Sequence, residues 1–178
     1  MILPFHQHRP PQPGSHEATS SAGVRVRGAT RDDLAPALEL EQVCFDSFRL
    51  NKRQLSYLQR CPNAAFVVAE VDGKVVGSAI GLTRQHRRGT VSGRLYSLAV
   101  DPTLRGRGIG RNLLRHMLDA LSARGARKVY LEVDASNQPA IALYERAGFE
   151  SIGKLDDYYG PGHHGLHMMH EARVAMVA

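Results

Sequence analysis

The chain has 178 residues, of which 43% are hydrophobic and 22% are charged. These proportions are typical of one soluble globular domain, and no stretch approaches the roughly 18 apolar residues of a membrane-spanning helix. Two cysteines, Cys44 and Cys61, exclude a disulfide framework, and the amino terminus lacks the pattern of a secretory signal. We therefore expect a cytoplasmic protein with no membrane contact.

The net charge of +6 is unevenly distributed along the chain. The 45 residues from Arg84 to Lys128 contain eleven basic and two acidic side chains, a local charge of +9. Such a cluster indicates a surface that binds phosphate groups or nucleic acid, although a solvated helix face has the same composition.

Residues 1–22 are rich in proline, histidine and serine without periodicity, which predicts a flexible tail before a domain over 23–178. A strand at 24–27 opens the domain, and two helices follow it. The segment Thr30-Arg-Asp-Asp is expected to supply the N-cap of the first helix, and the second helix covers 52–60. The apolar residues of the first helix are Leu34, Leu38 and Val43.

Strands at 65–71 and 74–82 are joined by Asp72-Gly73, a strong hairpin signal. A third strand at 94–100 precedes a helix over 109–123, for which Gly125 is the expected stop. One face of this helix is apolar, with Ile109, Leu113, Leu114, Met117, Leu118 and Leu121.

The remaining elements are a strand at 129–133, a helix over 137–147, and strands at 149–155 and 166–169 around a loop over 158–165. The order β-α-α-β-β-β-α-β-α-β-β predicts an α/β domain with a mixed central sheet flanked by helices.

The glycine-rich run from Arg105 to Gly110 lies between a predicted strand and a predicted helix. Its glycines let the backbone turn sharply, and the helix directs its positive end toward the same place. The run is not a Walker loop, and Arg111 occupies the position of the third glycine in the dinucleotide fingerprint. We predict a phosphate site here, and a connector without a ligand is the alternative.

Glu132 interrupts an otherwise apolar strand. A buried carboxylate has a raised pKa and can act as a general base, whereas a half-exposed strand would direct it to solvent. Tyr144 lies seven residues after Asn137, about two helical turns, so both share one helix face. A core aromatic is the alternative interpretation of Tyr144.

Residues 94–170 resemble the GNAT (GCN5-related N-acetyltransferase) superfamily. LAVDPTLRGRGIGRNLL matches its [RQ]xxGxG acetyl-CoA loop, and LEVDASNQPAIALYERAGF matches the second half of the cofactor site. The latter motif, followed by Tyr158-Tyr159, is most similar to ribosomal-protein-alanine (protein N-terminal) acetyltransferases. Those enzymes usually have acidic residues after the tyrosine pair, where this chain has Gly160-Pro-Gly-His-His, and this departure leaves the acceptor open.

The resemblance implies a GNAT fold and transfer of an acetyl group from acetyl-CoA to a primary amine, expected to be a protein or peptide N-terminal α-amine. It implies that Glu132 deprotonates the amine, that Tyr144 protonates the coenzyme A thiolate, and that Asn137 contacts the pantetheine arm. The residues expected to bind the cofactor through their backbone are Leu98, Ala99, Val100, Arg105, Gly106, Arg107, Gly108, Ile109, Gly110 and Arg111. The residues expected to flank the acceptor are Phe45, Phe48, Tyr158 and Tyr159.

Other functions stay open at this point. A small amine (an amino acid, a polyamine or a drug) would use the same site, and two binding modules without catalysis, one for acetyl-CoA and one for RNA or the ribosome, are further alternatives. Coenzyme A phosphates account for part of the basic charge, which disfavours a nucleic-acid partner. We expect no metal, because the histidines near the carboxyl terminus do not converge on one strand face: His163, His164, His167 and His170. A homodimer is one option for the oligomeric state.

Overall fold

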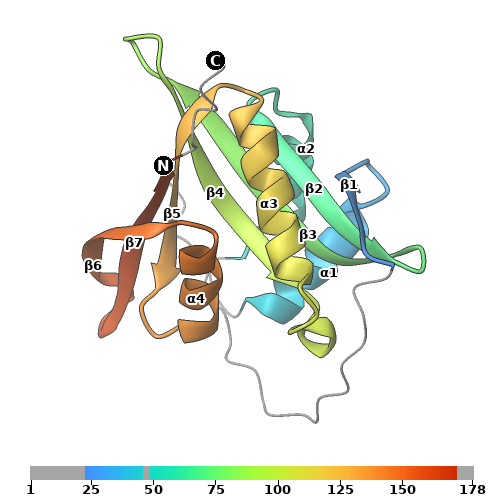
Figure 1. Ribbon diagram of the computed structural model, residues 1–178. Coiled ribbons are helices and arrows are strands. Elements are labelled where there is room, and N and C mark those ends of the chain that lie inside the picture. The colour runs from blue at the N-terminus through green and yellow to red at the C-terminus, as the bar shows by residue number, and fades with distance from the viewer. Residues whose placement is uncertain (1–22, 46–48, 172–178) are drawn as a thin grey trace.

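The computed structural model describes residues 23–45 and 49–171. They form a seven-stranded sheet in the order β1-β2-β3-β4-β5-β7-β6 (Figure 1). The strands are β1 (Arg25–Gly28), β2 (Ala64–Val71), β3 (Lys74–Gln85), β4 (Val91–Val100), β5 (Ala126–Asp134), β6 (Glu150–Gly160) and β7 (His163–Glu171). The helices are α1 (Leu34–Cys44), α2 (Lys52–Arg60), α3 (Ile109–Ser122) and α4 (Gln138–Arg146), with a 3₁₀ turn η1 (Pro102–Leu104). The expected order of elements is confirmed.

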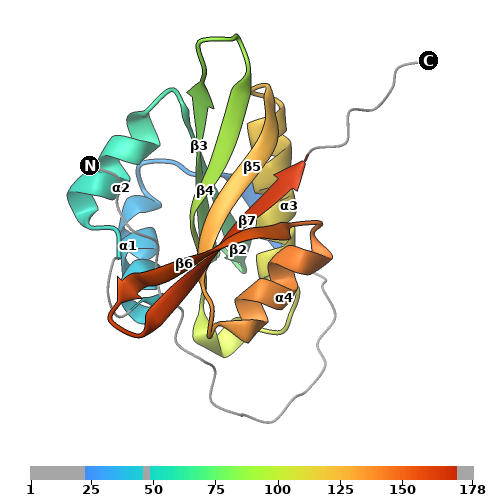
Figure 2. The ribbon, with the colours of Figure 1, turned by 90° about the vertical axis from the view of Figure 1, so that its left-hand side faces the viewer.

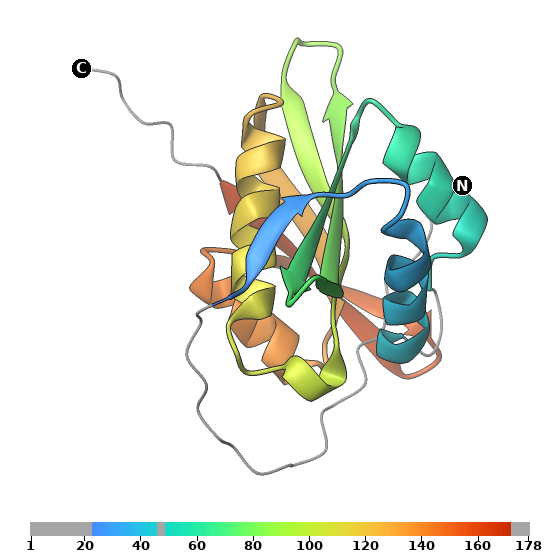
Figure 3. The ribbon, with the colours of Figure 1, turned by 90° about the vertical axis from the view of Figure 1, so that its right-hand side faces the viewer.

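Helices cover both faces of the sheet. Figures 2 and 3 show α1 and α2 on one face and α3 and α4 on the other. All neighbouring strands are antiparallel except β4 and β5, which are parallel because α3 connects them across the sheet. The predicted apolar face of α3 is confirmed, and its fully buried members are Leu113, Leu114, Met117 and Leu121. This packing fixes the start of α3 beside the glycine-rich loop.

The first helix begins as predicted and differs from its prediction near its end. Its N-cap is Asp33, within the expected segment 30–33, and Oδ2 of Asp33 accepts hydrogen bonds from the Thr30 amide and hydroxyl. Val43 is not a core residue, since its side chain is 60% exposed. The buried residues, at the i, i+3, i+4 and i+7 spacing of one helix face, are Ala37, Leu40, Glu41 and Cys44.

The carboxyl-terminal strands are longer than predicted. The segment 158–165 is not a loop, because β6 continues to Gly160 and β7 begins at His163. The ladder passes from the Leu155–Gly165 pair directly to Gly160–His163, so four residues of β6 bulge out opposite one residue of β7. Asp157 has a φ of +51° within this bulge. Polar residues that ordinarily mark a turn are therefore accommodated inside a strand.

A buried carboxylate joins α1 to the central sheet. Glu41 has no exposed surface, its Oε1 accepts a 2.5 Å hydrogen bond from the Ser97 hydroxyl, and its Oε2 accepts a 2.8 Å bond from the Leu50 amide. Burial raises the pKa of Glu41 to about 7, and these two hydrogen bonds oppose part of the rise. Because Ser97 lies on β4, Glu41 holds α1 against the strand that leads to the glycine-rich loop.

We expect Glu41→Gln to change how the stability of the protein depends on pH. The pKa of Glu41 is about 7 in the folded protein against 4.5 for a free side chain, so its ionisation costs on the order of 3 kcal/mol of stability. That loss develops as the pH rises from about 4.5 and is complete above about 7. Urea unfolding at pH 5 and pH 8 should show this pH-dependent loss in the parent and not in the variant.

The control for this experiment is Glu39→Gln, which removes an exposed carboxylate from the same helix. It should leave the pH dependence of unfolding as it is in the parent. If Glu41→Gln and the parent lost the same free energy between pH 5 and pH 8, the raised pKa of Glu41 would be contradicted.

Candidate active site

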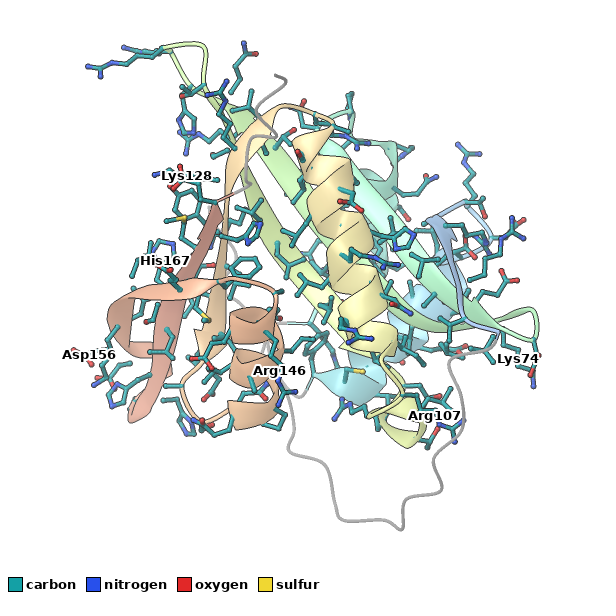
Figure 4. All side chains as sticks on the ribbon, viewed as in Figure 1. Lys74, Arg107, Lys128, Arg146, Asp156 and His167 are labelled. Carbon is teal, nitrogen blue, oxygen red and sulfur yellow. The ribbon has the colours of Figure 1, made fainter. Side chains whose placement is uncertain are left out.

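The glycine-rich loop has the backbone conformation that its sequence predicts. Gly106 and Gly108 have φ angles of +79° and +78°, and a Cβ on either residue would meet no atom within 4 Å. Gly108 is the N-cap residue of α3, so the first amide groups of that helix lie next to this open space. Figure 4 shows the Arg107 side chain at the surface of the same loop. The loop can therefore accept an anion through backbone amides.

Gly110 lies in the first turn of α3 and is less constrained than predicted. A Cβ on this residue would make ordinary contacts of 3.5–3.9 Å with Leu143, Val100 and Leu98. Its neighbours show instead that the end of β4, the start of α3 and helix α4 meet at one point.

The parallel strands β4 and β5 separate before they end (Figure 1). Their ladder stops at the Arg94–Tyr130 pair, although β4 runs on to Val100 and β5 to Asp134. On its other edge β4 stays paired with β3 as far as the Gly77–Val100 pair. In the described structure, the edge of residues 95–100 that faces β5 thus has no strand partner. Such an edge presents N–H and C=O groups to an extended ligand.

The residues 98–100 are suited to contact a ligand through their backbone. The side chains of Leu98 and Ala99 are buried, and Leu98 packs in the core beneath α3. The carbonyl of Val100 accepts a 3.3 Å hydrogen bond from the Cys44 thiol. Burial raises the pKa of the Cys44 thiol, and the positive charge of Arg105 opposes this rise. Arg105 is the first residue of the glycine-rich loop, so the loop begins close to the end of α1.

Helix α4 carries the other two predicted residues of the cofactor side. The Oδ1 of Asn137 caps the helix by accepting a 3.2 Å hydrogen bond from the Ala140 amide. Its Nδ2 is buried and has no hydrogen-bond partner within residues 23–45 and 49–171. Tyr144 is 5% exposed and packs edge-on against Phe149 with ring centroids 5.7 Å apart. Burial raises the pKa of Tyr144, so its hydroxyl stays protonated.

Glu132 is neither an unpartnered buried carboxylate nor a solvent-facing one. Its side chain is 8% exposed, and its Oε2 accepts a 2.7 Å hydrogen bond from Nη2 of Arg94, on β4. Its Oε1 lies 3.8 Å from Nε2 of His167, on β7. Alternation along β5 places Glu132 on the sheet face opposite α3, because Leu131 and Val133 lie in the core beneath that helix. Sequence reasoning missed Arg94 and His167, since the strand register that brings them to Glu132 is not visible in one sequence.

The predicted acceptor residues fall into two groups. Tyr158 and Tyr159 pack with perpendicular rings 5.0 Å apart, against Gly165, where a Cβ would lie 3.3 Å from the Tyr159 ring. Burial raises the pKa of Tyr159, and the nearby negative charge of Glu132 adds to this rise, while Tyr158 and Tyr144 also lie within electrostatic reach of the Tyr159 hydroxyl. The structure thus brings the tyrosine pair close to both predicted catalytic residues.

The predicted phenylalanines lie at the end of α1 and beyond it. Phe45 is 1% exposed and belongs to a small core group with Leu40, Cys44 and Ala99. Phe48 lies outside the described residues. Phe45 therefore supports the strand end at residue 99 from the α1 side, while contact of either ring with an acceptor stays a prediction.

The histidines near the carboxyl terminus have separate surroundings. His164 Nδ1 accepts a 3.1 Å hydrogen bond from the Asp157 amide, and the His170 ring stacks 5.3 Å from that of Phe149. Across residues 23–45 and 49–171, no three His, Cys, Asp or Glu side chains gather in a way that could hold a metal ion. The helices in the same ranges include none that is long and apolar enough to cross a membrane.

Comparison with known proteins agrees with this geometry. The family model described as "Acetyltransferase (GNAT) family" matches residues 34–149. The chain belongs to the GNAT family of acetyltransferases. It is 43% identical over 142 residues to N-alpha-acetyltransferase RimI of Mycobacterium tuberculosis, a match that covers 76% of this chain and 84% of that protein. The resemblance predicted from the two sequence motifs is confirmed.

Two solved structures share the fold. The ribosomal-protein-S18-alanine N-acetyltransferase from Escherichia coli has a TM-score of 0.72 and 27% identity, and the match covers 86% of this chain and 97% of that one. Arabidopsis thaliana Naa50 in complex with the bisubstrate analogue CoA-Ac-MVNAL has a TM-score of 0.74 and 24% identity, covering 85% and 100%. The mixed sheet with its separated β4 and β5 is therefore the GNAT fold.

Gly108 gives a direct test of anion binding at the loop. Both Asn and Asp tolerate the left-handed backbone that Gly108 adopts, and the two residues have nearly the same size. We expect Gly108→Asp to weaken coenzyme A binding about tenfold or more relative to Gly108→Asn, because a carboxylate would repel the phosphates. Isothermal titration calorimetry at low salt measures the difference, which should shrink as salt screens the charges. Equal affinities in the two variants would exclude a phosphate at this loop.

Proposed function

We propose that this protein transfers the acetyl group of acetyl-CoA to the α-amine at the N-terminus of a protein. The observation that carries the proposal is the unpartnered edge of β4, which runs from Arg94, beside Glu132, to the glycine-rich loop. A relative named N-alpha-acetyltransferase and a structural neighbour named ribosomal-protein-alanine N-acetyltransferase support an N-terminal acceptor. A ribosomal protein is the acceptor that the second name suggests.

The described residues fit acetyl-CoA, which supplies an acetyl group activated as a thioester. The open space at Gly106 and Gly108 and the first amides of α3 suit a pyrophosphate, with the exposed arginines Arg107 and Arg111 beside it. The backbone of Leu98–Val100 suits the amide-rich pantetheine arm, and the unpartnered Nδ2 of Asn137 is a further donor for it. The Nδ2 of Asn137 and the β5-facing edge of β4 thus present hydrogen-bonding capacity that the described fold leaves unused.

Glu132 is the residue we assign to receive the proton of the incoming ammonium group. Arg94 engages Oε2 of Glu132, so Oε1 is the oxygen available for this task, directly or through a water. An α-amine has a pKa of about 7.7–8.0, against about 10.4 for a lysine side chain. Deprotonating an α-amine therefore demands less of the Glu132 carboxylate than deprotonating a lysine would.

Tyr144 completes the proton transfers. A nitrogen–carbon bond forms between the neutral amine and the acetyl carbon, the carbon–sulfur bond breaks, and the departing sulfur takes a proton from the Tyr144 hydroxyl. The new amide nitrogen releases its surplus proton to water, and the Tyr144 phenolate takes a proton back from water, so that the hydroxyl is restored for the next turnover. The raised pKa of Tyr144 keeps this hydroxyl protonated until the thiolate departs.

The acceptor is expected to approach from the sheet face opposite α3. Glu132 points to this face, on which α1 and α2 pack against β2, β3 and β4 (Figure 2), while β7 lies beyond β5 in the strand order. The half-buried ring of Tyr158 is held by the β6 bulge and by Tyr159, whose hydroxyl senses the charge of Glu132, and we assign it to one wall of this approach. A peptide backbone extending from its N-terminus would pass this wall, whereas a compact amine would not reach it.

Tyr144→Phe tests the assignment of the general acid. The ring and its packing on Phe149 are preserved, while the transferable proton is removed. We expect turnover to fall by about 10²–10⁴-fold with coenzyme A affinity little changed. Steady-state kinetics and calorimetry measure the two quantities, and Tyr57→Phe on the exposed face of α2 is the matched control. A Tyr144→Phe variant as active as the parent would show that the sulfur leaves without this proton.

The acceptor class is tested with three sets of amines. Coenzyme A release is measured with free N-terminal peptides, with lysine peptides whose N-terminus is blocked, and with small amines such as polyamines. We expect efficient acetylation of the first set, and an increase of KM for those peptides in Tyr158→Ala. Tyr159 is kept in this experiment, because it is 5% exposed and its loss would disturb the core. Efficient turnover of small amines with no turnover of N-terminal peptides would overturn the proposal.

A further inference from the structure

Apart from Arg94, which pairs with Glu132, the basic residues between Arg84 and Lys128 separate into two groups in the structure. The first group surrounds the glycine-rich loop and the start of α3, and it lies where coenzyme A phosphates are proposed to bind. The second group, which we call the basic end, lies on the β3–β4 hairpin and on the turn from α3 into β5. The basic end consists of Arg84, Arg87, Arg88, Arg124, Arg127 and Lys128.

Neighbouring strands bring the residues of the basic end together. The ladder places Arg84 beside Ser92 and Ser92 beside Lys128, across three adjacent strands. A Cβ on Gly125 would lie 3.6 Å from the Val91 side chain, so the α3–β5 turn packs against the base of the hairpin. Figure 1 shows this hairpin projecting beyond the body of the molecule, and Figure 4 labels Lys128 below it.

Coenzyme A does not account for the charge of the basic end. Helix α3 has 14 residues and is therefore about 21 Å long, with the glycine-rich loop at its start and Arg124 just after its end. Within residues 23–45 and 49–171, the five arginines of the basic end form no ion pair, and Lys128 has a contact of 3.8 Å with Glu171. All six side chains are exposed. Like charges without counter-charges repel one another, so this arrangement suits an external polyanion.

We propose that the basic end binds the phosphate backbone of RNA. Arginine predominates in it, and the planar guanidinium group matches phosphate oxygens with two parallel hydrogen bonds. Segments 84–92 and 122–128 contain no Phe, Tyr or Trp, so contacts to phosphates outweigh stacking on bases and we expect little dependence on sequence. Among the described residues, the large exposed apolar side chains are Val43, Tyr57 and Ile152, all outside the basic end, which disfavours a membrane or an apolar protein partner.

The proposed function favours RNA over other polyanions. An acetyltransferase that modifies the N-terminus of a ribosomal protein meets its acceptor near ribosomal RNA, and the basic end would hold the enzyme there. Only the choice of RNA as the partner rests on the proposed function, whereas the polyanion-binding surface itself is argued from the basic end. RNA binding is measured without acetyl transfer, so failure of one proposal is distinguishable from failure of the other.

The test replaces Arg84, Arg87 and Arg88 by glutamine in the full-length protein. Binding to a fluorescent RNA hairpin is measured by anisotropy over a salt series. Each lost phosphate contact lowers the slope of log K against log salt by about 0.7–0.9, so we expect the slope to fall by about two to three units in the triple variant. Acetylation of a free N-terminal peptide should stay within about twofold of the parent, because the basic end is remote from the glycine-rich loop.

The matched control removes three positive charges from α2 through Lys52→Gln, Arg53→Gln and Arg60→Gln. This control should keep the parent salt slope. Equal slopes in the parent and the Arg84/Arg87/Arg88 variant would overturn the proposal, and so would an equal reduction in both variants, which would indicate net charge alone. Tighter binding of polyglutamate or of duplex DNA than of the RNA hairpin would likewise overturn RNA as the partner.

Discussion

The early end of the β4–β5 ladder is the constraint on which the site depends. Parallel strands ordinarily satisfy their backbone groups along their whole shared length, and here pairing stops at Arg94 and Tyr130. The separation leaves an extended edge on β4 that leads toward the glycine-rich loop. It also places residues of two diverging strands, Arg94 and Glu132, close enough for a 2.7 Å ion pair at the point of divergence.

Several interactions keep β4 in place although one of its edges is unpaired. On the α1 side, Glu41 binds the Ser97 hydroxyl and Cys44 binds the Val100 carbonyl. On the α3 side, Leu98 packs in the main core. An irregularity between Ile80 and Gly81 in the β3–β4 ladder changes the twist just before Ser97. The strand is thus fixed by helices on both faces and by β3, which leaves its remaining edge available for a ligand.

The sequence predicted the parts of the fold that depend on local signals. The Asp72-Gly73 hairpin, the apolar face of α3 and the glycines before it follow from turn chemistry and helical periodicity, and all are present. The buried face of the first helix was harder to predict, because it includes a carboxylate, Glu41, while the apolar Val43 faces solvent. A pattern of apolar residues cannot identify a polar group whose partners, Ser97 and Leu50, are brought to it by the tertiary structure.

The candidate site likewise has residues that local sequence signals reveal and residues that only the tertiary structure brings together. The loop and the Asn137–Tyr144 helix carry recognisable motifs, whereas Arg94 and His167 reach Glu132 through strand register alone. The sequence likewise did not predict the full length of β6, because a bulge keeps turn-forming polar residues within the strand. The excess of basic residues was visible in the sequence, but only the structure shows that they gather at two opposite ends of α3.

The most direct measurement of the central claim is a crystal structure of this protein with a bisubstrate analogue that joins coenzyme A to an N-terminal peptide. The account predicts the pantetheine arm along Leu98–Val100 between β4 and β5, the pyrophosphate at Gly106–Gly108, and the peptide on the Glu132 face beside Tyr158. A coenzyme A moiety bound away from the β4 edge, or a peptide entering from the α3 face, would contradict it.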